Sequence, residues 1–261
     1  MKTIVLIALF AAGVLLGGWT VQAEAKVSST QSDALALPMG VSIKFDAASS
    51  PGEVSQSIKI MMLLTLLSLA PSAMIMTTSF TRILIVFGFL RQALGTQSSP
   101  PAQVLAGMAL FLTVFIMSPV WQKINKEAIQ PYLAEEIGQQ DAWDRGIQPV
   151  KEFMARQTGQ SEMALFMELS GKEKSADVTQ AGLETLVPAF MISELKKAFQ
   201  MGFLIYLPFL VIDMVVATIL MALGMMMLPP MMISLPVKLL FFVMADGWTV
   251  MVRSLIMSFS G

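Results

Sequence analysis

The chain of 261 residues contains neither cysteine nor histidine. The absence of cysteine excludes disulfide bonds and thiolate metal sites, and the absence of histidine removes the commonest general base and zinc ligand. Charge is also scarce, because charged residues make up 13% of the chain, against about 25% in an ordinary soluble domain. The net charge of −1 gives no indication of a nucleic-acid partner. We therefore expect no enzyme, no cofactor and no bound metal.

Apolar residues are abundant, at 55% of the chain, and the mean hydropathy is +0.70. This composition is typical of a membrane protein. Long apolar segments with helical character occupy residues 58–76, 80–94, 104–121, 186–224 and 233–257. The sequence predicts an all-α membrane protein with about four long, partly kinked apolar helices arranged as hairpins, and a small helical extracytoplasmic region.

The N-terminus resembles a secretory signal, with Lys2, an uncharged apolar run and small residues at the cleavage spacing. The alternative is a retained membrane anchor. The expected divisions are a cleaved signal peptide at 1–25, an extracytoplasmic lead at 26–56, a first helical hairpin at 57–121, an extracytoplasmic helical region at 122–185, and a second hairpin with a methionine-rich turn at 186–261.

The distribution of positive charge predicts how the chain crosses the membrane. Arg82 and Arg91 lie between the first two spans without an acidic residue, as expected of a cytoplasmic connection. Residues 122–185 would then lie outside, where Pro131 is expected to interrupt a helix. The methionine-rich turn would lie on the inner side.

Six methionines fall within twelve positions at this turn: Met221, Met225, Met226, Met227, Met231 and Met232. Methionine is flexible and fills irregular gaps, so these side chains could be filler between helices. They could also form a deformable seal across a pore made by several copies, since apolar constrictions gate by excluding water. The residues alone do not choose between the two interpretations.

Charged residues within the apolar segments are candidates for function because a charge at membrane depth is costly. Asp213 could be a proton or ion relay, or a structural partner of Lys238 or Arg253 in the paired helix. A hairpin that closes near Leu228 would place Asp213 closer to the level of Asp246, which hints at a partner in another subunit.

Two further pairs are suggested by helical spacing. Glu194 and Lys197 lie three residues apart and are expected to form a solvated or interfacial ion pair. A Ser193–Lys197 dyad for nucleophilic catalysis has no other support in the sequence. There is no glycine-rich phosphate loop and no cluster of metal ligands.

Several long motifs of this chain are distinctive. They are Met-Thr-Thr-Ser-Phe-Thr-Arg at 76–82, Leu-Arg-Gln-Ala-Leu-Gly-Thr-Gln at 90–97 followed by Pro100-Pro101, Met-Ser-Pro-Val-Trp at 117–121, Ser-Glu-Leu-Lys-Lys-Ala-Phe-Gln-Met-Gly-Phe at 193–203, the segment from 207 to 227, and Asp-Gly-Trp at 246–248. Together these motifs resemble the FliP family of type III secretion export-gate subunits. The resemblance covers about residues 55–259.

The resemblance implies a pore-forming subunit of the flagellar protein export gate, in the bacterial inner membrane at the flagellar basal body. It implies a homo-oligomer, a pentamer in the family, with FliQ-like and FliR-like membrane subunits and other membrane proteins of the export apparatus. Unfolded flagellar subunits would pass through it. The family's methionine loop is a channel constriction and matches Met225, Met226 and Met227, which favours the seal. The alternative is an ion-coupled transporter or proton channel using Asp213 and Lys238, although the repeat symmetry common in transporters is absent.

Overall fold

The computed structural model describes residues 34–36, 42–44, 51–96, 99–171, 181–225 and 227–260. The expected signal peptide, most of the expected lead and Met226 lie outside the described residues. The chain divides into two units, Met1–Ala73 and Met74–Gly261.

The first unit contains a short antiparallel hairpin and most of one helix. Strand β1, Ala34–Ala36, pairs with β2, Ser42–Lys44, with Leu35 opposite Ile43. Helix α2 follows as Pro51–Thr77 and continues past the boundary between the units. The helix begins earlier than the predicted residue 58. The hairpin was not predicted because three-residue strands are too short to show an alternating pattern.

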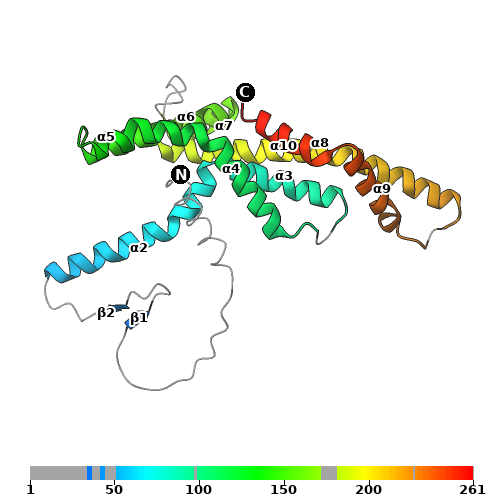
Figure 1. Cartoon of the computed structure of the whole chain (residues 1–261), viewed down its shortest axis with the longest axis horizontal. Coiled ribbons are helices and arrows are strands. Elements are labelled where there is room, and N and C mark those ends of the chain that lie inside the picture. The colour runs from blue at the N-terminus through cyan, green and yellow to red at the C-terminus, as the bar shows by residue number, and fades with distance from the viewer. Residues whose placement is uncertain are drawn as a thin grey trace, which may run out of the picture. The chain divides into compact units, whose positions relative to one another are not determined.

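The second unit is entirely helical where the structure describes it (Figure 1). Its helices are α3 (Phe80–Ala93), α4 (Ala102–Ile124), the π-helix η1 (Asn125–Ile129), α5 (Gln130–Leu133), α6 (Gln139–Gln157), α7 (Gln160–Leu169), α8 (Leu183–Ala222), α9 (Pro230–Met244) and α10 (Gly247–Met257). Among the described residues, Ala102–Leu133 and Leu183–Ala222 could each cross a membrane by length and composition, and this part of the chain has up to four spans if each bent helix pair is counted as one. The predicted all-α membrane fold is confirmed.

The expected interruption at Pro131 is wrong, since the helix runs on to Leu133. The turn before the proline is a π-helix, in which the N–H of Gln130 bonds to the carbonyl of Asn125. Proline has no N–H to contribute and its ring crowds the preceding turn. The wider π turn accommodates that proline without ending the helix.

Two apolar clusters form the core, and α8 contributes to both. The first joins α3, α4, α8, α9 and α10 around Phe87, Leu90 and Leu255. The second joins α4, α6 and α7 to the start of α8, around Met154 and Phe190. Helix α3 lies along α8 (Figure 1). Side chains of α8 therefore face two different groups of helices along its length.

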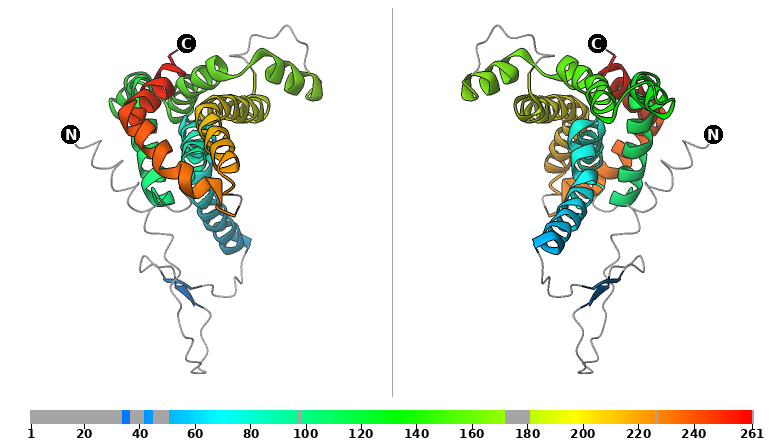
Figure 2. Two further views of the ribbon diagram at one scale, coloured as in Figure 1. Left: turned by 90° about the vertical axis from the view of Figure 1, so that its right-hand side faces the viewer. Right: turned by 90° about the vertical axis from the view of Figure 1, so that its left-hand side faces the viewer.

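The predicted last span at 233–257 is not one continuous helix, because α9 and α10 meet at a bend of 65° (Figure 2, orange to red). Asp246 lies at the bend with φ 49° and ψ 47°. Aspartate tolerates this left-handed conformation better than most residues. Gly247 follows, and a Cβ there would lie 2.2 Å from the ring of Phe242. The Asp-Gly pair thus ends one helix and allows close packing at the start of the next.

Candidate functional site

The methionine turn is built by a helix stop and a helix start that lie close together. Gly224, at φ 74°, ends α8 by donating its N–H to the carbonyl of Met221, while Met225 donates to Leu220. This pair of bonds is a Schellman motif, which glycine favours because it adopts positive φ without strain. Pro229 and Pro230 then begin α9, where a missing N–H costs nothing.

The described methionines of this turn point away from the protein core. Met227 is 98% exposed, and the other described members of the predicted set are exposed as well: Met221, Met225, Met231 and Met232. The turn lies at one end of the second unit, opposite the tip formed by α5 and α6 (Figure 1). So many exposed apolar side chains in one place mark a surface that contacts something outside the chain.

Asp213 of α8 forms an ion pair with Lys238 of α9. The two groups lie 2.6 Å apart, and Lys238 also donates to the carbonyl of Ala93 at 3.0 Å. The hydroxyl of Ser234 donates to the second carboxylate oxygen at 2.6 Å. Lys238 is buried, whereas the side chain of Asp213 keeps 29% of its surface exposed. The cluster joins the two helices of the hairpin to the end of α3.

The suggestion that Asp213 finds its partner in another subunit is therefore wrong. The hairpin is centred between Ala222 and Pro230, where α8 ends and α9 begins, and not on Leu228. That shift of the centre brings Asp213 level with Lys238. Two other predicted charges are exposed: Asp246, at the bend before α10, and Arg253, on α10. Asp246 accepts a hydrogen bond from Thr249 at 3.0 Å.

A second ion pair is completely buried. Arg82 of α3 donates from Nε to Glu194 of α8 at 2.8 Å, and its Nη2 contacts the other carboxylate oxygen. Nη2 also donates to the side chain of Gln157 at 3.0 Å, and Nη1 donates to the carbonyl and hydroxyl of Ser258. All five guanidinium donors thus have acceptors. The pair joins α3, α6, α8 and the C-terminal residues.

The ring of Phe259 covers this pair, with the Arg82 guanidinium carbon 3.8 Å from its centre. The side chain of Gln157 donates to the carbonyl of Phe259 at 3.2 Å. Its main-chain oxygen accepts a hydrogen bond from the Nζ of Lys197 at 2.8 Å. Burial of an ion pair is tolerated when its remaining hydrogen bonds are satisfied in this way.

One sequence expectation about these residues is wrong: Glu194 is buried and pairs with Arg82, and not with Lys197 in a solvated or interfacial pair. The hydroxyl of Ser193 accepts from the N–H of Gly159 at 2.7 Å. Spacing along one helix could not show these contacts, because the partners are distant in sequence.

A third ion pair links the candidate span Leu183–Ala222 to α7, which lies outside the candidate spans. Lys196 donates to Glu162 of α7 at 2.8 Å, and this hydrogen bond lowers the pKa of the Glu162 carboxyl. The Lys196 side chain is 54% exposed and that of Glu162 is 11% exposed. The pair ties α7 to α8.

We expect a small pH dependence from this pair. Because the pKa of Glu162 is lower in the folded protein, its stabilising contribution is present above the pKa of an unfolded glutamate, about 4.3, and is lost as the pH falls further. Glu162→Gln should lose less than about 1 kcal/mol at neutral pH, since Lys196 is exposed. Thermal unfolding between pH 7 and pH 3.5 checks this: the difference between the variant and the unchanged protein should shrink on acidification, and a constant difference contradicts it.

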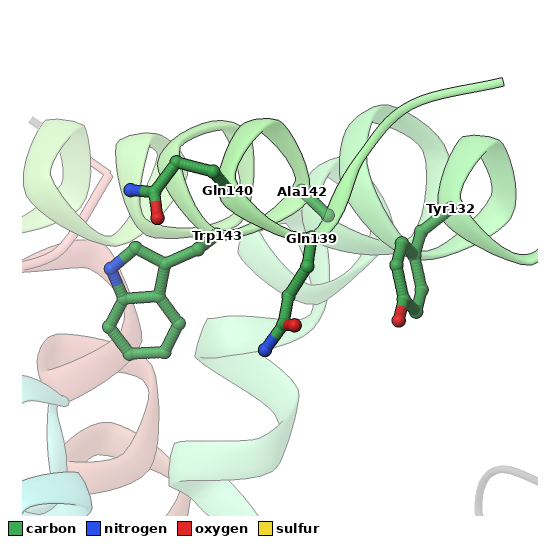
Figure 3. Close-up of a pocket in the computed structure, with 5 residues that line it drawn as sticks. All are labelled: Tyr132, Gln139, Gln140, Ala142 and Trp143. Carbon is green, nitrogen blue, oxygen red and sulfur yellow. The ribbon is translucent and has the colours of Figure 1, made fainter. Parts of the chain in front are cut away.

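A hollow of about 840 Å³ lies beside the tip of α5 and α6. Figure 3 shows its lining side chains, Tyr132, Gln139, Gln140, Ala142 and Trp143. An apolar groove of about 380 Å³ shares Tyr132 and Trp143 with it. Trp143 is 66% exposed. The lining of the hollow offers a phenol, an indole and two amides, and these five residues include no charged side chain.

The helices and the ion pairs Arg82–Glu194 and Asp213–Lys238 define an all-α membrane protein whose apolar hairpin is held by charges and ends in an exposed methionine turn. The chain belongs to the FliP family, whose model matches residues 63–255. This confirms the resemblance seen in the sequence.

Flagellar biosynthetic proteins FliP of several bacteria are similar over most of their length. That of Bacillus subtilis (strain 168) is 52% identical over 217 residues, which are 83% of this chain and 98% of the relative. That of Pectobacterium carotovorum subsp. carotovorum is 50% identical over 203 residues, which are 78% of this chain and 79% of the relative. That of Borreliella burgdorferi is 42% identical over 238 residues, which cover 89% of this chain and 94% of the relative.

Proposed function

We propose that this protein is a pore-forming core subunit of the flagellar type III protein export gate. Several copies, five by analogy with the family, form a ring that conducts unfolded flagellar subunits. Membership of the FliP family supports a role in flagellar biosynthesis. The subunit performs no catalysis, and energy comes from its partners and the proton gradient.

One observation carries the pore proposal: the exposed apolar turn at the end of a rigidly held hairpin. The Asp213–Lys238 pair and the hydrogen bond to Ala93 fix the hairpin to α3. The turn beyond them presents Met227 almost fully exposed. When several copies are arranged around an axis, such turns can meet and exclude water, and flexible methionines can still yield to a passing polypeptide.

The ring would be set in the bacterial inner membrane at the flagellar basal body. Its partners would be FliQ-like and FliR-like membrane subunits, other export-apparatus membrane proteins and membrane lipid. The exposed apolar side chains along α8, such as Phe203, Leu204 and Val211, suit contact with lipid or with these apolar partners. The extracytoplasmic placement of residues 122–185 and the cleaved signal peptide belong to the same proposal.

Replacing Met225, Met226 and Met227 with alanine should leave the complex assembled but make the membrane leaky to small ions. Alanine is too small to fill the axis, while the Asp213–Lys238 pair that holds the hairpin is untouched. The measurement is ion flux into vesicles that contain the purified complex, together with its size on a native gel. Alanine at exposed Met214, which lies on α8 away from the methionine turn, is the matched control and should not leak. An assembled triple variant with unchanged leakage would falsify the seal.

A further inference from the structure

The side chains of the methionine turn contain sulfur that can be oxidised, a property that an apolar seal does not need. We propose that the methionine turn is a redox modification site, at which a hydroperoxide converts thioethers to sulfoxides and loosens the seal. This inference rests on the proposed function. The residues that would be oxidised are Met225, Met227, Met231 and Met232.

Exposure separates these methionines from those of the core. Met227, Met231 and Met232 are exposed by 98%, 62% and 71%. Met154 and Met163, which pack in the second apolar cluster, are exposed by 0% and 3%. Because susceptibility to oxidation follows access of the oxidant to the sulfur, the turn should react long before the core does.

The reaction is a two-electron oxidation. The thioether sulfur attacks one oxygen of the hydroperoxide, an S–O bond forms and the O–O bond breaks. The sulfur is oxidised. With hydrogen peroxide as the oxidant, the second oxygen takes up a proton and leaves as one molecule of water. The product is a sulfoxide, which methionine sulfoxide reductases reverse. No nearby acid, base or metal is needed, so the reaction requires only an exposed turn.

The product would act directly on the seal. A sulfoxide is polar and accepts hydrogen bonds, whereas the thioether is apolar. An apolar constriction closes because water is unfavourable inside it. Polar oxygens on turns that meet at the axis would stabilise water there. The gate would therefore leak ions under oxidising conditions and reseal after reduction.

Leucine provides a matched control, since it is apolar and similar in volume but has no sulfur to oxidise. The variant carries leucine at 225, 227, 231 and 232, and also at Met226, so that no methionine remains between Gly224 and Ile233, and Met221 at the end of α8 is kept. Exposed methionines elsewhere, such as Met214 and Met244, are kept. Their contribution is therefore measured in the variant itself.

The experiment measures ion leak across vesicles that contain the whole complex, before and after hydrogen peroxide, with peptide mass mapping of the sulfoxides. In the unchanged protein, oxygen should appear first on the turn, the leak should rise toward that of the alanine variant, and sulfoxide reductase with a dithiol should reverse it. The leucine variant should be sealed before treatment and should stay sealed.

Two results would overturn the inference: a turn that carries sulfoxides without any added leak, or a leucine variant that leaks as much as the unchanged protein after peroxide. A turn that stays unmodified while buried methionines react would also overturn it. Failure of the proposed seal is seen separately, because the alanine variant would then not leak even before oxidation.

Discussion

Replacing Arg82 with glutamine should destabilise the protein by about 3–5 kcal/mol, the cost of leaving one member of a buried ion pair without its partner. The Glu194 carboxylate is fully buried and would lose its guanidinium. The C-terminal residues would also be released, since Ser258 is held by the same group. We expect little protein in the membrane and a large fall in the unfolding temperature in detergent.

The double variant Arg82→Gln, Glu194→Gln separates loss of the ion pair from loss of packing. If the two charges depend on each other, the double variant should lose less stability than the two single losses added together. The exposed pair of Lys123 and Glu152, 3.1 Å apart, is the matched control. Lys123→Gln should cost less than about 1 kcal/mol. Additive losses at Arg82 and Glu194, or equal losses at both pairs, would contradict the assigned role.

Replacing Asp213 with asparagine should weaken assembly of the complex more than it changes any dependence on pH. Lys238 would remain as a buried cation without its countercharge, and the position of α9 would loosen. Since α9 begins directly after the methionine turn, turns of neighbouring copies should no longer meet in register. Assembly is measured as the fraction of the subunit that runs in the large complex on a native gel. The pH dependence of protein export is measured in parallel for comparison.

Asp246→Asn is the control for this prediction, because Asp246 is exposed and its carboxylate accepts a hydrogen bond from the hydroxyl of Thr249. It should assemble normally. Adding Lys238→Met to Asp213→Asn removes the stranded charge and should restore part of the assembly. A fully assembled Asp213→Asn complex with altered proton coupling would instead favour the ion-coupled transporter, in which Asp213 is a relay.

Composition and apolar periodicity predicted the class of fold, because a membrane imposes long uncharged helices whatever their packing. The same reasoning found the methionine turn, since the proline pair and Gly224 are local signals. Helix boundaries were less accurate. The break at Asp246 was missed because its cause is a left-handed backbone conformation within a stretch that is apolar on both sides.

Lys238 was one of the two partners that the sequence offered for Asp213, and the structure confirms it. The partners of Arg82 and Glu194 could not be predicted from spacing. Arg82 and Glu194 are 112 residues apart, and Gln157 comes from a third segment. One signal was available: an arginine and a glutamate within apolar segments both need compensation when buried, which suggests that they pair with each other. The local i, i+3 rule gave Lys197 the wrong role because it considers only one helix.

Imaging of single particles of the purified complex tests the central claim most directly. The account predicts a ring of copies in which the turns between Ala222 and Pro230 converge on the axis, with Met225 and Met227 closing it. A complex whose turns point outward into detergent, or pack within their own protomer, would contradict the account.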